Sequence, residues 1–78
     1  MSKYHENNEV WRLETGFLAA YTEDKSLMGR VRRYKYKAGW SKMARYYKNE
    51  KLLGVHYKLP IEQKRVAFRM FGVTDLTE

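Results

Sequence analysis

The stretch that decides the fold is WSKMARYYKNEKLLGVHYK, residues 40–58. Two runs rich in strand-forming residues flank Asn49 and Glu50, a polar pair typical of a tight turn. Residues 40–48 and 51–58 are therefore predicted to pair as a β-hairpin. Alternation along the second strand gives two faces, with Leu53, Val55 and Tyr57 on one and Leu52, His56 and Lys58 on the other.

Upstream of the hairpin, residues 10–13 and 17–22 have strand patterns on either side of a turn at residues 14–16. A helix is predicted next, because Asp24 or Thr22 can accept hydrogen bonds from its first free backbone amides. Its apolar stripe has the 3.6-residue period and consists of Leu27, Met28, Val31 and Tyr34. This spacing predicts that Tyr34 belongs to the core.

Downstream of the helix, residues 36–39 are predicted to form a loop that leads into the hairpin. Pro60 suits the first position of a second helix, where its missing amide hydrogen would be unpaired in any case. That helix has a broad apolar surface and a narrow polar stripe, and Gly72 is placed to end it.

The predicted order is strand–strand–helix, repeated once. It gives an α+β fold of the type ββαββα, a four-stranded antiparallel sheet with two helices on one face. Weak similarity between the halves favours an internal repeat, since each begins with a tryptophan (Trp11, Trp40) and has a tyrosine at the end of its second strand (Tyr21, Tyr57). We expect one domain at residues 10–73, a flexible arm at 1–9 and a flexible tail at 74–78.

Charge is unevenly distributed along the 78 residues, whose formal net charge is +7. Residues 1–24 carry −3, residues 25–69 carry +12 and residues 70–78 carry −2. The absence of cysteine excludes disulfides and thiol chemistry and fits a cytoplasmic protein. The longest apolar run, residues 17–21, is too short to span a bilayer, so no membrane partner is expected. A chain this short gains stability by self-association, which makes a homo-oligomer one expectation.

The segment between Lys25 and Asn49 has no acidic residue and nine basic ones, interleaved with five aromatic residues. Cations with flat rings suit a polyanion that also offers faces for stacking, so nucleic acid, and single-stranded nucleic acid in particular, is the first expected partner. The predicted binding residues are Arg30, Arg32, Arg33, Lys35, Tyr36, Lys37, Trp40, Lys42, Arg45, Tyr47 and Lys48. Trp40 has an alternative place in the core, and strand alternation puts Tyr46 and Tyr47 on opposite faces, so that only one is on an open surface.

A second reading of the same block is a protein-interaction module that binds an acidic protein. Catalysis is not expected, because no nucleophile, phosphate loop or metal-ligand constellation occurs, and neither a cofactor nor a metal is predicted. Glu62-Gln63-Lys64 matches half of a nuclease motif, but that motif lies on a strand with another acid close by. Here it opens a predicted helix, where a glutamate is favoured by the helix dipole.

Three segments resemble small basic proteins encoded by bacteriophages and prophages of Gram-positive bacteria. They are Tyr21-Thr22-Glu23-Asp24-Lys25-Ser26-Leu27, Tyr57-Lys58-Leu59-Pro60 and Lys64-Arg65-Val66-Ala67-Phe68-Arg69. The resemblance covers the chain from Phe17 onward and implies a phage origin, with a role in handling phage nucleic acid, in binding a host protein or as a virion component. It assigns no functional residue.

Overall fold

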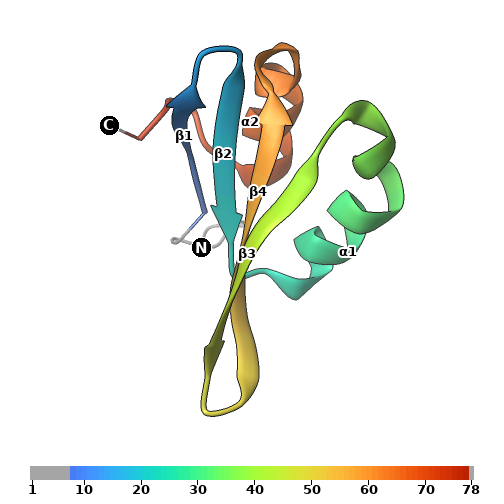
Figure 1. Ribbon diagram of the computed structural model, residues 1–78, viewed down its shortest axis with the longest axis vertical. Helices are drawn as coiled ribbons and strands as arrows, with labels where there is room; N and C mark the ends of the chain where they lie inside the picture. Colours follow the sequence, from blue (N-terminus) through green and yellow to red (C-terminus); the bar gives the residue numbers. More distant parts are fainter. Residues whose placement is uncertain (1–7, 78) are drawn as a thin grey trace.

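The computed structural model describes residues 8–77 and confirms the predicted ββαββα order (Figure 1). Four antiparallel strands form one sheet in the order β1-β2-β4-β3. The elements are β1 (Glu9–Glu14), β2 (Phe17–Thr22), α1 (Lys25–Tyr34), the 3-10 turn η1 (Tyr36–Ala38), β3 (Ser41–Lys48), β4 (Lys51–Pro60), the 3-10 turn η2 (Ile61–Gln63) and α2 (Lys64–Phe71). The fold class is therefore α+β, as the alternation and cap residues predicted.

Both helices pack on the same face of the sheet. Leu27 and Val31 of α1 share one buried cluster with Ala67 and Phe71 of α2. The sheet contributes Val10, Leu18, Ala20, Val55, Tyr57 and Leu59 to that cluster. We call this side the covered face and the opposite side the open face, because no helix of residues 8–77 packs on the latter.

The hairpin turn and the helix ends have the predicted chemistry. Asn49 and Glu50 both have positive φ, 53° and 66°, as a two-residue turn between twisted strands requires. The Asp24 carboxylate accepts hydrogen bonds from the amides of Ser26 and Leu27, which confirms it as the cap of α1. Gly72 ends α2 with a left-handed φ of 69°.

Pro60 has a different place from the one predicted. It is the last residue of β4, where it lies opposite Phe17, and its ψ of 148° is extended. The chain then forms η2, fixed by a hydrogen bond of 3.0 Å from the Ile61 amide to the Gly16 carbonyl, before α2 begins at Lys64. The fixed φ of proline is compatible both with the first position of a helix and with the end of a strand. Pairing of Pro60 with Phe17 in the sheet selects the strand conformation.

At both ends of the described chain, residues assigned by the sequence to the flexible arm (1–9) and tail (74–78) contact the domain. Asn8 is buried: its side-chain amide donates to the Phe71 carbonyl at 3.0 Å and its oxygen accepts from the Thr22 hydroxyl at 2.6 Å. Glu9 already belongs to β1. At the other end the Thr77 amide donates to the Val10 carbonyl at 2.7 Å. The rest of the predicted arm, residues 1–7, and residue 78 lie outside the described residues.

A bulge in the hairpin corrects the predicted faces of β4. Tyr46 lies opposite Gly54 and Tyr47 opposite Leu52, so Leu53 is an extra residue without a partner. Because one extra residue reverses the alternation, Leu52 lies on the side of Val55 and packs against the core. Leu53 is 39% exposed and belongs to the open face.

The two halves of the chain repeat their topology but not their side chains. Trp40 and Tyr57 are 3% and 1% exposed and belong to the core. Their predicted counterparts Trp11 and Tyr21 are only partly buried and lie on the open face, where both line one hollow. The matching residue types therefore do not occupy equivalent positions.

Candidate nucleic-acid interface

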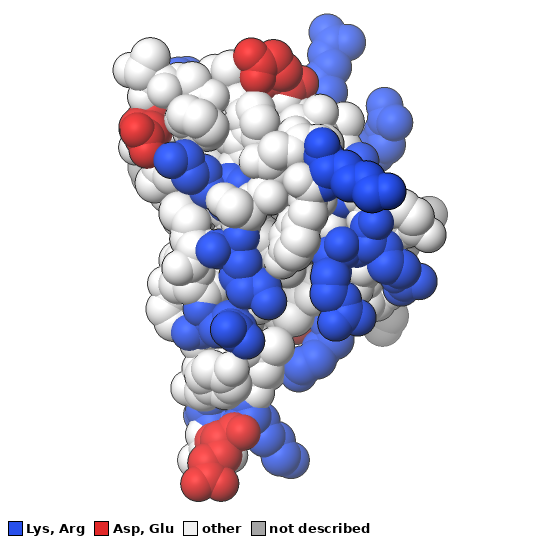
Figure 2. Space-filling view, turned by 45° about the vertical axis from the view of Figure 1, so that its right-hand side comes forward, with Lys and Arg blue, Asp and Glu red and all other residues white. Residues whose placement is uncertain are grey.

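The acid-free segment forms one side of the molecule, which we call the basic surface. Its cations come from α1, η1 and β3, and they are Lys25, Arg30, Arg32, Arg33, Lys35, Lys37, Lys42, Arg45 and Lys48. Figure 2 shows Lys and Arg gathered over this side, with acidic side chains mainly at the two ends of the view. Within residues 8–77, no salt bridge neutralises any of these nine cations. The surface therefore presents its positive charge to solvent.

A hollow of about 230 Å³ lies between α1 and the hairpin on this surface. Three cations line it: Lys25 and Arg32, which lie on one face of α1, and Lys42, which comes from β3. The Lys25 ammonium also donates to the Leu52 carbonyl at 2.9 Å, which ties the start of α1 to the hairpin. Three cations around one depression are suited to an anionic group such as a phosphate.

The floor of this hollow includes the Tyr57 ring of the core, and its wall includes Tyr36. Burial first, and then the charge of ionised Tyr36, raise the pKa of Tyr57 to about 12, against a smaller opposing effect of Arg32. Tyr36 is 39% exposed, so one ring stands among the cations as predicted.

A second bulge, at Met43, aligns the cations of β3. Lys42 lies opposite Tyr57 and Ala44 opposite His56, so Met43 has no partner. Lys42 and Arg45 consequently both oppose residues of the covered face, although their spacing of three would put them on opposite faces of a regular strand. Sequence alternation could not reveal this alignment.

Two aromatic predictions are corrected by burial. Trp40, predicted as a binding residue, is 3% exposed: its ring lies 6.3 Å from that of Tyr57, and its indole nitrogen donates to the Gln63 side chain. Tyr34, predicted for the core, is 63% exposed and has the Arg33 guanidinium 5.9 Å from its ring centre. It is the last residue of α1, and Leu27 and Val31 are the buried positions of that helix.

Tyr47, another predicted binding residue, does not line the hollow of the basic surface. Tyr46 lies opposite Gly54 and Tyr47 opposite Leu52, so consecutive rings leave β3 on opposite sides. Both are nevertheless exposed, by 40% and 59%, and both border a hollow of about 590 Å³ on the open face. The pairing agrees with the expectation that the two rings lie on opposite sides of the strand, whereas the expectation that only one of them is exposed was wrong. We call this depression the aromatic hollow; its residues are Glu9, Trp11, Tyr21, Tyr46, Tyr47, Leu53 and His56.

Edge-to-face contacts organise the aromatic hollow around His56. The imidazole lies 5.0 Å from the Trp11 ring and 4.9 Å from the rings of both Tyr21 and Tyr46, each in a T-shaped arrangement. The Tyr46 hydroxyl and His56 Nδ1 are 2.7 Å apart, within hydrogen-bond distance. Such mutual contacts hold the rings in fixed orientations.

The charge state of this hollow is set by burial and by nearby acids. Burial lowers the pKa of His56 below its usual value, and the opposing effect of Glu9 is smaller, so the imidazole is neutral at pH 7. Burial, followed by the hydrogen bond to Glu23 at 2.7 Å, raises the pKa of Tyr21 to about 12. Glu9 is therefore the charged group among the residues that line the hollow.

Sequence reasoning did not select Trp11, Tyr21 or His56 as site residues. A signal was present, because Trp11 and Tyr21 occupy strand positions that alternate with the core residues Val10 and Ala20. Large rings at positions that alternate with core residues indicate an apolar outer face.

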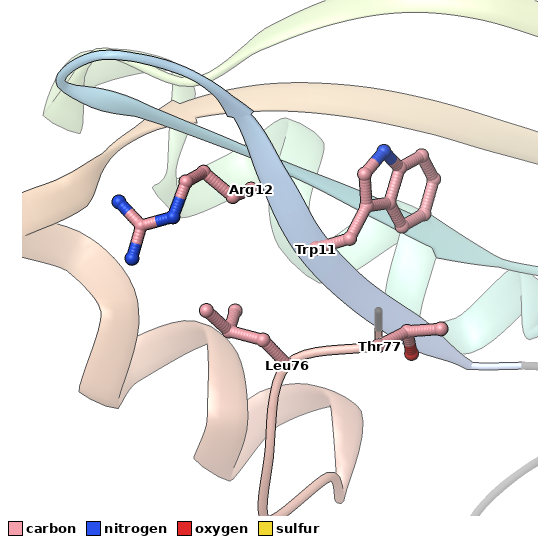
Figure 3. Close-up of a pocket in the computed structure, with 4 residues that line it drawn as sticks. All are labelled: Trp11, Arg12, Leu76 and Thr77. Carbon is pink, nitrogen blue, oxygen red and sulfur yellow. The ribbon is translucent and has the colours of Figure 1, made fainter.

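A further hollow of about 520 Å³ lies at the outer edge of β1 (Figure 3). Trp11 and Arg12 point to opposite sides of the strand, and Leu76 and Thr77 lie beside it. The C-terminal segment thus partly covers a sheet edge that would otherwise be open. Its polar side chains, one guanidinium and one hydroxyl, form no reactive pair.

Metal and membrane features are not found in the described part of the chain. Among residues 8–77, no group of three or more His, Cys, Asp or Glu side chains could hold a metal ion. Glu62 and Lys64 of the half-motif lie in η2 and at the start of α2, not on a strand. Neither α1 nor α2 is long and apolar enough to cross a bilayer.

Comparison of the chain with protein-family models, with curated proteins and with solved structures gave no match.

Proposed function

We propose that this protein is a nucleic-acid-binding module rather than an enzyme, and that it binds phosphates through the basic surface. The observation that carries the proposal is the cluster of Lys25, Arg32 and Lys42 around one hollow, with no ion pair to a described acid. Cations without acidic partners are available to phosphates, and the counterions that they displace from the nucleic acid supply free energy.

Salt dependence is the diagnostic property of such binding. Each phosphate neutralised by a lysine or arginine adds about 0.7–0.9 to the slope of log K against log salt. Fluorescence anisotropy with labelled oligonucleotides, from low to near-physiological salt, measures both the affinity and this slope.

A matched pair of triple variants tests the location. Arg32→Gln, Lys42→Gln and Arg45→Gln together remove three charges from the basic surface and should reduce the salt slope by about 2–3. Lys64→Gln, Arg65→Gln and Arg69→Gln remove the same charge from exposed positions of α2 and should change the slope little. An equal reduction of the salt slope in both triple variants would show that net charge alone is responsible. The absence of binding by the unmodified protein at low salt would refute the proposal.

A protein-interaction module, with an acidic protein as partner, is the second candidate. Leu13, Met43 and Leu53 are each between 37% and 40% exposed, more apolar surface than phosphate binding requires. The phage origin that the resemblance implies is compatible with either role. A pull-down from host lysate treated with nuclease separates the two candidates. A partner that is retained after the treatment favours protein binding, and a partner that is lost favours nucleic-acid binding.

A further inference from the structure

We propose that the ligand is single-stranded nucleic acid, with its phosphates along β3 and its bases on the aromatic hollow of the open face. This inference rests on the proposed function. It adds a second surface, a class of ligand and the orientation of that ligand across the sheet. Four observations carry it: the edge position of β3, the exposed rings, their fixed orientation and the charge of the lining.

β3 is the edge strand at which the two surfaces meet. It ends the order β1-β2-β4-β3, so one of its sides has no neighbouring strand in the sheet. Its residues Lys42 and Arg45 oppose residues of the covered face, whereas Tyr46 opposes Gly54 and lines the aromatic hollow. Tyr47, opposite Leu52 near the hairpin turn, borders the same hollow. Eight residues of strand extend over about 26 Å, enough for several nucleotides side by side. A backbone that follows this edge would have cations on one side and rings on the other.

The rings of the hollow can accept bases without rearrangement. Tyr47 is 59% exposed and, within residues 8–77, makes no ring contact with another aromatic side chain, which leaves its faces available. Tyr46 is 40% exposed and is held edge-to-face against His56 and against Tyr21, whose ring centre is 6.0 Å away. Stacking on Tyr46, whose ring these contacts already order, costs little side-chain entropy. Duplex bases are stacked on one another and paired, so they cannot present their faces to such a surface.

The charge across the open face orients the bound nucleic acid, with its phosphates toward β3 and its bases toward β1. Phosphates are favoured at the β3 edge, while at the far side of the hollow Glu9 of β1 would repel them. A carboxylate accepts hydrogen bonds from exocyclic amino groups, as glutamate does from cytosine N4. Bases that point from β3 toward β1 would meet Glu9 with their edges, so cytosine is favoured over thymine, which has no amino group.

The test measures anisotropy with labelled oligo(dC), oligo(dT) and a duplex of the same length. The unmodified protein should bind oligo(dC) most tightly and the duplex least. Tyr47→Leu should weaken binding to the single strands about tenfold. Tyr34→Leu, which removes a tyrosine that is 63% exposed on α1 outside the aromatic hollow, should weaken binding to the single strands much less than Tyr47→Leu does. Glu9→Gln should reduce the preference for oligo(dC). Oligo(dC) should also quench tryptophan emission in the unmodified protein but not in Trp11→Phe, which retains the buried Trp40.

The outcomes separate this inference from the proposed function. If the duplex binds as well as the single strands and Tyr47→Leu behaves like Tyr34→Leu, the inference is overturned, although binding by the basic surface stands. If no oligonucleotide binds at low salt, the proposed function itself fails. Circular dichroism of each variant confirms folding, and the quenching of Trp11 in the unmodified protein tests the location without any substitution at Tyr47.

Discussion

The covered face and the open face of the sheet are both rich in aromatic rings, yet they have opposite roles. On the covered face Tyr57 is 1% exposed beneath two helices, and Phe71 and Trp40 complete the packing. On the open face His56, the neighbour of Tyr57 in β4, is surrounded by rings that remain accessible to solvent. The same strand thus supplies a core and a surface, so residue type alone does not distinguish structural from binding aromatics.

The comparison also separates charge from stacking. Among the described residues, the hollow of the basic surface has three cations, the exposed Tyr36 and the buried Tyr57, whereas the aromatic hollow has several rings and Glu9 as its charged group. β3 lies between them, and the bulges at Met43 of β3 and at Leu53 of β4 decide on which side the neighbouring residues of each strand lie. A ligand that uses both surfaces must therefore pass over this edge strand.

The largest expected difference between the faces comes from truncating one ring on each. Phe71→Ala removes a fully buried ring and should cost about 3–5 kcal/mol in the free energy of unfolding. Tyr46→Ala removes a ring that is 40% exposed and should cost about 1 kcal/mol, mainly through its hydrogen bond to His56. Urea denaturation followed by circular dichroism measures both. Similar losses would mean that the open face is itself buried in solution, for example against a second copy.

Two glycine substitutions compare the tolerance of the two faces. At Gly54 a Cβ atom would lie only 2.6 Å from Cζ of Tyr21, so Gly54→Ala must displace that ring from His56 and should cost about 1–3 kcal/mol. At Gly29, in α1, the nearest atom is 3.4 Å away on the flexible Arg33 side chain, and Gly29→Ala should stabilise the helix by about 1 kcal/mol. Thermal denaturation gives the sign of the stability change for each variant. Near-ultraviolet circular dichroism detects a change in aromatic packing, as expected if Gly54→Ala displaces the Tyr21 ring. A stabilising Gly54→Ala or a destabilising Gly29→Ala would contradict the packing described.

Loss of the α1 cap should affect the basic surface and leave the open face unchanged. Asp24→Ala removes the acceptor for the amides of Ser26 and Leu27 and should cost about 1 kcal/mol. Hydrogen exchange should then accelerate at those two amides and remain unchanged at His56. Faster exchange throughout the sheet would show that α1 and the sheet unfold as one unit.

The smallest expected effect is a pH dependence that originates on the open face. Because the pKa of His56 is lower in the folded state, the unfolded chain binds more protons below about pH 6.5. Stability should therefore rise with pH from the folded pKa up to about pH 6.5 and then level off. The difference between the protein and His56→Gln across this range isolates the contribution of His56 from that of the carboxylates. An NMR titration that placed the pKa of His56 above about 6.5 would contradict this sign.

Sequence patterns predicted the fold because its determinants are local. The Asp24 cap, the Asn49–Glu50 turn and the terminating Gly72 each act within a few residues, and all three are confirmed. The basic surface was also predicted, since charge on a small domain remains at the surface wherever the helix and strand place it. Trp40 and Tyr34 were misplaced because the environment of a ring depends on what packs over it.

The sequence by itself determined the ββαββα order, the positions of the turns and the side of the chain that carries positive charge, because periodicity, caps and net charge do not depend on distant residues. Only the tertiary structure decided which rings are buried and which are open. The unpaired Met43 reverses the alternation of β3 and aligns Lys42 with Arg45 on one side, and the unpaired Leu53 reverses that of β4, so Leu52 packs toward the core and Leu53 lies on the open face. Such a change in register results from pairing between strands, and neither strand encodes it alone.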